Sequence, residues 1–158
     1  MTQSKPRGRM APDPQEAFSA PSGYVLEQQI GFILRCVHQR ATEIFSTTMS
    51  RHGVTPTQFA VLAKLDDQGS VSQNLLGRLT AMDPATTSGV VGRLIARGFV
   101  SQSPDPQDAR LVLLTLTPAG RAAVAEMKVD AAEVSRRTLQ PLSSTEAASL
   151  LAALEKLK

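Results

Sequence analysis

The sequence predicts a mainly α-helical fold with a small β-hairpin, and three observations carry the prediction. From residue 24 onwards, apolar residues recur at helical spacing over most of the chain. Three pairs of a capping residue and a proline mark helix starts. They are Thr55-Pro56, Asp83-Pro84 and Thr117-Pro118. Only residues 99–116 combine apolar and β-branched runs with a Pro- and Asp-rich turn.

The chain has 158 residues with 42% apolar and 20% charged content, which are globular values that allow a real core. We expect residues 1–22 to form a disordered tail and residues 23–158 to form a single domain. The tail mixes prolines with Lys5, Arg7 and Arg9, and its alternative role is an extra arm that contacts phosphates. There is no secretory apolar segment and no run that could span a bilayer, so we expect a cytoplasmic protein without membrane partners.

Residues 24–51 contain no proline and one glycine, and they are expected to form one long helix. Apolar positions cover too much of its circumference for a helix with a single buried face. The helix is therefore expected to lie between its own domain and a partner subunit. Its two apolar stripes are Ile30, Ile33, Val37 and Ile44, and Leu34, Ala41, Phe45 and Met49.

The next helix begins at Thr55-Pro56, where Gln58 is placed to close a capping box. It carries Phe59, Leu62 and Leu65 and is expected to end near Gly69. This helix is expected to support the pair of helices that follows.

Two short helices come next. Ser72 can cap the first, whose apolar side is Leu75, Leu76 and Leu79, and the chain then turns at Ala81-Met82. Asp83 at the N-cap and Pro84 at the first helical position start the second, which is expected to run to Gly98. Its apolar stripe is Thr87, Val91, Leu94 and Ile95, with Val90 at the edge.

The opposite side of this second helix is made of small residues with no acid. It consists of Ala85, Thr86, Gly89, Gly92, Arg93 and Ala96. A glycine inside a helix costs about 1 kcal/mol relative to alanine, so a bare backbone indicates close approach to another surface. A DNA major groove, whose phosphates repel carboxylates, fits this side. Tight helix packing is an equally good alternative from the wheel alone.

Residues 99–102 and 111–116 read as two strands joined by the turn SPDPQDAR. Helix, turn, helix and a hairpin with an arginine near its tip form a winged helix-turn-helix arrangement. The arrangement predicts double-stranded DNA as a partner. The formal charge of +3 and the pI of 9.4 favour a polyanionic partner only mildly.

Two helices complete the chain. Thr117-Pro118 starts one that should run to about Leu139, and Pro141 breaks it. The segment Ser143–Glu146 starts the last, whose apolar side is Leu150, Leu151, Leu154 and Leu157. Such a leucine-rich helix would be poorly covered in a monomer, so we expect a homodimer. The dimerisation helices would be residues 24–52 and 117–157, around a reading core of residues 54–117.

The wing carries the sequence Asp108-Ala109-Arg110 and, after it, the run of residues 114–120, LTLTPAG. This resembles the MarR family (multiple antibiotic resistance regulators), whose wing has D-x-R followed by L-x-L-T-x-x-G. The resemblance extends from about Tyr24 to the C-terminus. It implies a homodimeric winged helix-turn-helix transcriptional regulator, expected to be a repressor that binds a palindromic operator. The stretches GFILRCVHQR and SQNLLGRLTAMDPATTSGVVGRLIARG resemble the branch that controls catabolism of nicotinate and related heteroaromatic acids.

The expected DNA contacts come from three segments. The predicted residues are Thr86, Ser88, Gly89 and Arg93 on the reading helix, Ser72, Gln73 and Asn74 before it, and Asp108 and Arg110 in the wing. Arg110 should enter the minor groove, where A·T-rich sequence deepens the negative potential. By resemblance, Asp108 should hold an arginine of the wing in place.

A second expected site lies on the long helix, where His38, Arg35 and Arg40 occur near Phe32 and Phe45. Apolar walls with basic groups would suit a small aromatic carboxylate. An internal carboxylate is the alternative partner for these basic groups. The family resemblance implies that such an effector binds between the dimer helices and the reading domain.

Cysteine and histidine usage argues against metal or disulfide chemistry. The single cysteine, Cys36, is expected to be a buried structural thiol, and its alternative is a peroxide sensor. The MarR branch that senses peroxides has its cysteine where this chain has Gly31. On one helix His38 and His52 would lie about 21 Å apart, too far to share an ion.

We expect no enzyme activity and no cofactor, because the chain lacks the common catalytic motifs. The remaining alternative is a non-specific DNA-binding or interaction module on the same fold.

Overall fold

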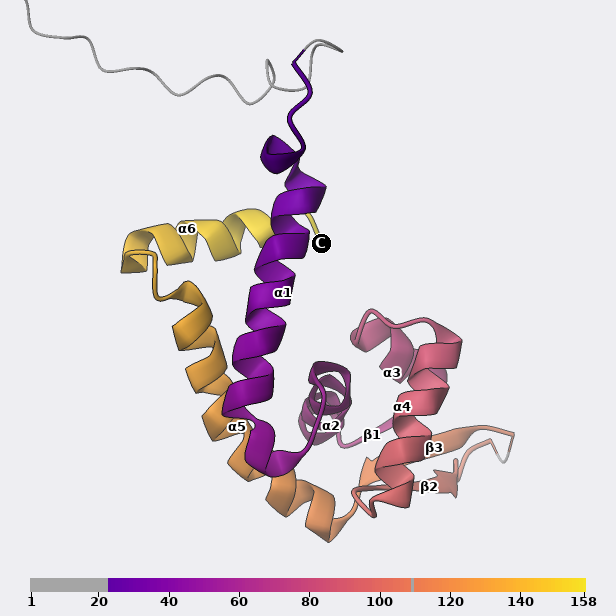
Figure 1. The fold of residues 1–158 in the computed structure, drawn as a ribbon. Helices are drawn as coiled ribbons and strands as arrows, with labels where there is room; N and C mark the ends of the chain where they lie inside the picture. Colours follow the sequence, from indigo (N-terminus) through magenta and orange to yellow (C-terminus); the bar gives the residue numbers. More distant parts are fainter. Residues whose placement is uncertain (1–22, 109) are drawn as a thin grey trace, which may run out of the picture. The chain divides into compact units, whose positions relative to one another are not determined.

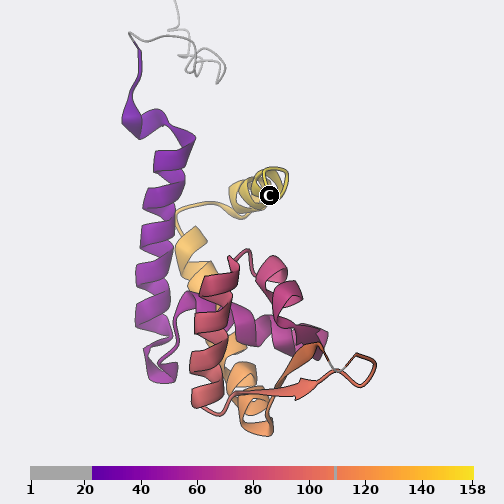
Figure 2. The same cartoon turned by 90° about the vertical axis from the view of Figure 1, so that its right-hand side faces the viewer.

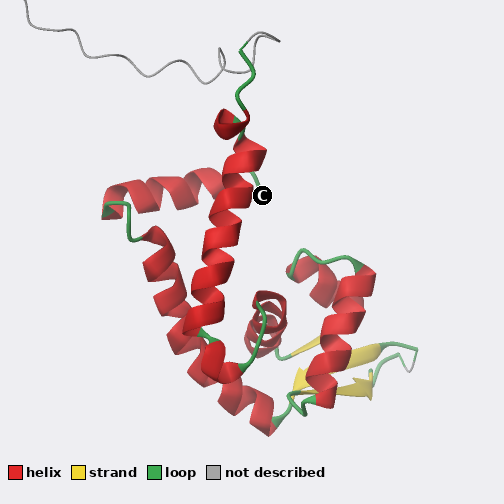
Figure 3. Ribbon diagram, viewed as in Figure 1, coloured by secondary structure: helices red, strands yellow, loops and turns green. Residues whose placement is uncertain are grey.

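The computed structural model describes residues 23–108 and 110–158 (Figure 1). These residues form two units that divide inside helix α1 (Ile30–Thr48), one ending at Gln39 and the other spanning Arg40–Lys158. Figure 3 shows that helices dominate. Among the described residues, three short strands form one sheet. The predicted fold class, mainly α with a small β element, is confirmed.

The N-terminal unit contains the 3-10 turn η2 (Leu26–Gln28) and the first part of α1. The predicted helix over residues 24–51 is wrong in extent. Val25 and Gln29 on either side of η2 have extended backbones, and the Gln29 side chain donates to the carbonyl of Val25 at 3.1 Å. The helix therefore begins only at Ile30.

The C-terminal end of the predicted helix differs too. After α1 the chain forms a second 3-10 turn, η3 (Ser50–His52). The turn ends at Gly53, whose φ of 59° lies in the left-handed region that glycine adopts without steric penalty. The break turns the chain into helix α2 (Pro56–Gln68), where the predicted capping box between Thr55 and Gln58 is present.

Helices α3 (Gln73–Leu79) and α4 (Pro84–Ala96) follow, with Ser72 and Asp83 as the predicted N-caps. The turn between them is tight. Ala81 has a φ of 52°, and the amide of Met82 donates to the carbonyl of Gly77 at 2.9 Å. A Cβ on Gly77 would come within 2.9 Å of the Thr87 hydroxyl, so glycine lets α3 and α4 approach closely here.

The sheet has three strands, β1 (Ser70–Ser72), β2 (Val100–Pro104) and β3 (Val112–Leu116), in the antiparallel order β1-β3-β2. The sequence predicted only the β2–β3 hairpin. Strand β1 is three residues long, and it pairs through Val71, which lies opposite Leu114 and is buried. Such a short Ser-Val-Ser segment gives no alternation signal of its own.

One aliphatic core holds the unit Arg40–Lys158 together. Three helices and one strand contribute fully buried leucines to it, which are Leu62, Leu65, Leu76, Leu94 and Leu114. Helix α5 (Pro118–Leu139) adds Val124 and Met127, and its first turn lies against Phe99, which follows α4. A Cβ on Gly120 would clash with the carbonyl of Phe99, so only glycine fits there.

Helix α6 (Ser144–Glu155) follows the C-terminal end of α5, which lies away from the sheet (Figure 1). Its capping box between Ser143 and Glu146 is present as predicted. None of its residues is buried in the single chain, and Leu150 and Leu151 are 40% and 51% exposed. The predicted leucine face of the last helix is thus uncovered in one subunit.

Candidate nucleic-acid interface

Helix α4 starts with a cap that fixes its first turn. Asp83 Oδ1 accepts the amide of Thr86 at 2.9 Å, and Asp83 Oδ2 accepts the Thr86 hydroxyl at 2.6 Å. These hydrogen bonds from Thr86 lower the pKa of Asp83, because they favour the ionised carboxylate. Both carboxylate oxygens of Asp83 thus bind the first turn of α4.

The two sides of α4 separate as the wheel predicted. Thr87, Val90, Val91 and Leu94 are buried in the core. The candidate DNA contacts Thr86, Ser88, Gly89 and Arg93 are all exposed. The exposed side carries no carboxylate between Pro84 and Ala96. A polyanion can therefore approach it without like-charge repulsion from the helix itself.

Packing within the subunit does not account for the glycines of this side. A Cβ built on Gly89 would meet only the guanidinium of Arg93, at 3.7 Å, and one on Gly92 would have nothing within 4 Å. Gly77 on α3 is the glycine that permits the tight helix packing. The alternative of helix packing for Gly89 and Gly92 is therefore wrong within the described residues of the subunit.

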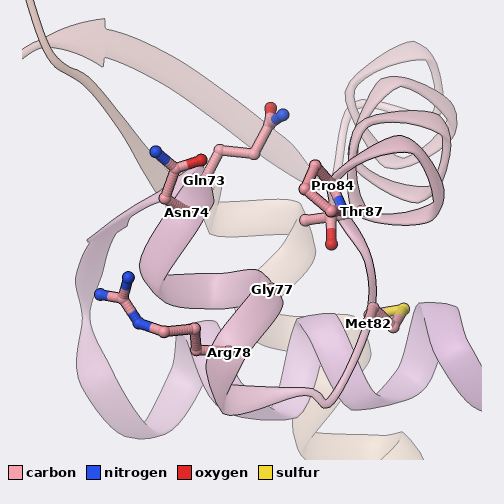
Figure 4. A pocket seen from close by; sticks show the side chains of 7 residues that line it. All are labelled: Gln73, Asn74, Gly77, Arg78, Met82, Pro84 and Thr87. Atoms are coloured by element: carbon pink, nitrogen blue, oxygen red, sulfur yellow. The ribbon is translucent and has the colours of Figure 1, made fainter.

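A hollow of about 240 Å³ lies between the start of α3 and the start of α4 (Figure 4). It brings together the predicted residues Gln73 and Asn74 with Arg78, which the sequence reasoning missed. Asn74 and Arg78 are four residues apart, so they share one side of α3, and that spacing could have identified Arg78. The remaining lining residues are Gly77, Met82, Pro84 and Thr87. Ser72 lies just before them and uses its hydroxyl to accept the amide of Leu75 at 3.4 Å.

The wing is the β2–β3 hairpin, which extends past α4 in Figures 1 and 2. Near its tip, Asp108 Oδ1 accepts the main-chain amide of Arg110 at 3.0 Å. Within residues 23–108 and 110–158, Asp108 has no ion pair with a guanidinium. Asp108 thus shapes the backbone that carries Arg110, whose side chain is exposed.

The predicted effector residues fall in two units of the structure. In the N-terminal unit, Phe32 is half-buried and Arg35 and His38 are exposed. In the second unit, Phe45 is 7% exposed and packs on Phe59 with ring centroids 6.0 Å apart. Phe45 therefore belongs to the core.

Arg40 lies on another side of α1 from Phe45. It lines a hollow of about 260 Å³ between the end of α1 and α5, together with Arg137, which the sequence reasoning missed. Arg137 Nη1 donates to the hydroxyl of Thr48 at 2.9 Å. Two guanidinium groups thus border the hollow, with the carboxylate of Glu43 beside them. The other lining residues are Ile44, Thr47 and Gln140.

Cys36 is exposed in the subunit, so the prediction of a buried thiol is wrong for the single chain. Among the described residues, no group of three His, Cys, Asp or Glu side chains is placed to hold a metal ion. In the same part of the chain, no helix combines the length and apolarity needed to cross a bilayer.

Comparison with known proteins places these features in a family context. Residues 54–112 match the MarR family. The chain is 38% identical over 134 residues to the HTH-type transcriptional repressor NicR of Pseudomonas putida, covering 85% of each protein. A probable transcriptional regulator from Pseudomonas aeruginosa has 47% identity and a TM-score of 0.81, over 85% of this chain and 100% of that one.

A further solved structure concerns the regulation of DNA binding of Bordetella bronchiseptica BpsR by 6-hydroxynicotinic acid. It is 40% identical to this chain, with a TM-score of 0.81, and the match covers 85% of this chain and 96% of that one.

Proposed function

The chain belongs to the MarR family of transcriptional regulators, and on that premise we propose how this protein works. It is a homodimeric repressor that binds a palindromic operator and releases it when a small heteroaromatic carboxylate binds. The observation that carries the proposal is the exposed, acid-free side of α4, where Gly89 and Gly92 leave the backbone open to an outside surface.

DNA binding would combine three contacts. The small residues of α4 let its backbone enter the major groove, and Arg93 adds a guanidinium that can pair with base edges or phosphates. Gln73, Asn74 and Arg78 line the hollow between α3 and α4 and would lie beside the same groove. Arg110 on the wing would reach the adjacent minor groove.

Dimer formation would cover the apolar surface that one subunit leaves open. Leu150, Leu151 and Leu157 on and after α6 are 40–73% exposed. In the N-terminal unit, Ile30, Ile33, Leu34 and Val37 are 41–51% exposed. A two-fold dimer through these helices would present two copies of α4 to successive major grooves, about 34–36 Å apart.

For the effector we propose a hydroxylated pyridine carboxylate. BpsR, whose DNA binding is regulated by 6-hydroxynicotinic acid, is 40% identical to this chain over most of both proteins. Two groups of basic side chains could pair with the carboxylate. The first is Arg35 and His38 with Phe32, and the second is Arg40 and Arg137 in the hollow beside α5.

The DNA-binding part is tested by selecting bound duplexes from genomic DNA. The affinity for the selected duplex and for a scrambled duplex of equal length is then measured across a salt series. A repressor keeps a specificity ratio of about 10³ or more at physiological salt. Equal affinity for both duplexes at every salt concentration would instead identify a non-specific DNA-binding module.

The effector part is tested with alanine variants of the two basic groups, assayed for release of the selected duplex by 6-hydroxynicotinate. If Arg35 and His38 bind the acid, Arg35→Ala and His38→Ala raise the concentration needed for release, whereas Arg40→Ala and Arg137→Ala do not. The opposite pattern assigns the acid to the hollow beside α5. If all four variants respond as the wild type does, both candidate sites are wrong.

A further inference from the structure

A series of polar contacts joins the end of α4, the recognition helix of the proposed function, to the middle of α5. At the C-cap of α4, Arg97 Nη1 donates to the carbonyl of Gly53 at 2.8 Å, and Nη2 donates to the carbonyl of His52 at 2.9 Å. His52 ends the 3-10 turn η3 and Gly53 caps it, so the guanidinium binds carbonyls that have no partner within the turn. The guanidinium also lies over the ring of Phe99, 4.8 Å from its centroid, which limits its freedom.

The same turn is held from the other side by α5. The side chain of His52 is 7% exposed, and its Nε2 lies 2.7 Å from Asp130 Oδ2. Arg51 Nε donates to that oxygen at 2.8 Å. Because Asp130 accepts from both, we assign the imidazole proton to Nε2. The 3.3 Å between Arg51 Nε and His52 Nε2 then separates two donors that share one acceptor.

Helices α4 and α5 are already joined where one ends and the other begins, because the hydroxyl of Thr117 at the N-cap of α5 donates to the carbonyl of Gly98 just after α4 at 2.7 Å. Helix α4 packs chiefly on α2, α3 and β2, and α5 packs chiefly on α2 and β3. The contacts of Arg97, His52 and Asp130 add a second polar connection between α4 and α5, which runs through η3. Bidentate, charge-assisted bonds fix orientation as well as distance.

We propose that Arg97, His52 and Asp130 are positioning residues that hold the recognition helix at a set angle to α5. The inference rests on the proposed function, in which α5 belongs to the dimer layer and α4 reads DNA. Two recognition helices must meet successive grooves at a fixed separation, so freedom between α4 and α5 lowers operator affinity even when each subunit stays folded.

The test uses the full-length protein, with affinity for the genomically selected duplex as the readout. Arg97→Met keeps an unbranched side chain against Phe99 but removes both donors, and His52→Leu removes the donor to Asp130. Each is expected to weaken operator binding about tenfold, within the usual range of coupling between sites. Arg97→Lys and His52→Gln keep a donor and should recover much of the loss, which tests whether the hydrogen bond itself is needed.

A double-variant cycle separates positioning from simple stabilisation. Arg97 and Asp130 each contact η3. The double variant Arg97→Met/Asp130→Asn should therefore lose little more operator affinity than the single variant with the larger loss. Independent effects would multiply. Lys128→Met is the matched control. It removes contacts of α5 with Asp66 and Asp67 of α2, at 2.7 and 3.0 Å, and should change affinity less than about twofold.

The outcomes distinguish the two proposals. If the wild type itself shows no specific duplex, the proposed function fails. If the wild type binds specifically and Arg97→Met and His52→Leu bind equally well, the positioning role is overturned and the proposed function stands. The positioning role is also overturned if the two losses of operator affinity multiply in the double variant. It is overturned as well if the loss of affinity in every variant is proportional to its decrease in melting temperature.

Discussion

The carboxylate of Asp83 accepts both the amide and the hydroxyl of Thr86, at 2.9 and 2.6 Å. An acid at the start of a DNA-reading helix would repel phosphate if it faced outwards. Here both of its oxygens face the first turn of α4. The hydroxyl of Thr86 is therefore engaged as a donor to Asp83, so in the proposed complex Thr86 would offer DNA its methyl group and an acceptor oxygen.

Replacing Asp83 should destabilise the reading domain through the start of α4. We expect Asp83→Ala to lower the melting temperature and Asp83→Ser, which can still cap the helix, to restore most of the loss. The pKa of Asp83 is lowered in the folded protein, so its contribution is present above the unfolded pKa. The difference between wild type and Asp83→Ala should thus shrink as the pH falls below about 4. Equal melting temperatures at neutral pH would contradict the capping role.

Substitutions at two glycines should have opposite effects. Gly89→Leu should abolish operator binding at unchanged or raised stability, because its Cβ has room and leucine favours helix. Gly77→Ala should lower the melting temperature, since its Cβ would lie 2.9 Å from the Thr87 hydroxyl and 3.2 Å from the Met82 carbonyl. Thermal melts and fluorescence anisotropy with operator DNA measure both. Wild-type affinity in Gly89→Leu would show that α4 does not enter the groove.

Truncation of the buried side of α4 tests the core. Leu94 is 0% exposed, and Leu94→Ala should reduce the free energy of unfolding by about 2–5 kcal/mol. Ile95→Ala, at a half-buried position of the same helix, should cost less. Urea denaturation followed by circular dichroism measures both. A larger loss for Ile95→Ala would mean that α4 is rotated from the orientation described.

The wing gives a prediction in which charge and geometry oppose each other. Asp108→Ala removes a negative charge but also the acceptor for the amide of Arg110, so we expect weaker operator binding. Arg110→Ala should weaken binding too, most strongly on operators with A·T-rich flanks. The measurement is operator affinity at low and moderate salt. Tighter operator binding by Asp108→Ala at low salt would contradict the role of Asp108 in shaping the wing, because it would show that Asp108 acts only by repelling phosphate.

The sequence predicted the reading helices well because their signals are local. The caps at Ser72, Asp83, Thr117 and Ser143 each need only a side chain and the amide three residues later. The two sides of α4 follow from helical periodicity alone. Since such features depend on near neighbours, tertiary packing did not change them.

Features that depend on distant residues were missed or misplaced. Strand β1 exists because β3 pairs with it, and Arg137 is 97 residues from Arg40 in the sequence although both line one hollow (137 − 40 = 97). The sequence analysis placed Phe45 among the effector residues because it lies on the same long helix as His38. The structure assigns it to the core because Phe59 of α2 covers it. The polar path from Arg97 to Asp130 likewise joins three segments, the end of α4, η3 and α5, that no local pattern relates.

The most direct test of ligand-controlled repression titrates 6-hydroxynicotinate into the protein bound to its selected operator at fixed salt, while parallel melts follow the free protein. The account predicts that operator affinity falls at least about tenfold over the concentration range in which the melting temperature rises. Benzoate, which lacks the ring nitrogen and hydroxyl, serves as the control acid and should act only at higher concentration. A rise in melting temperature with unchanged operator affinity would contradict the central claim, because the acid would then bind without controlling DNA.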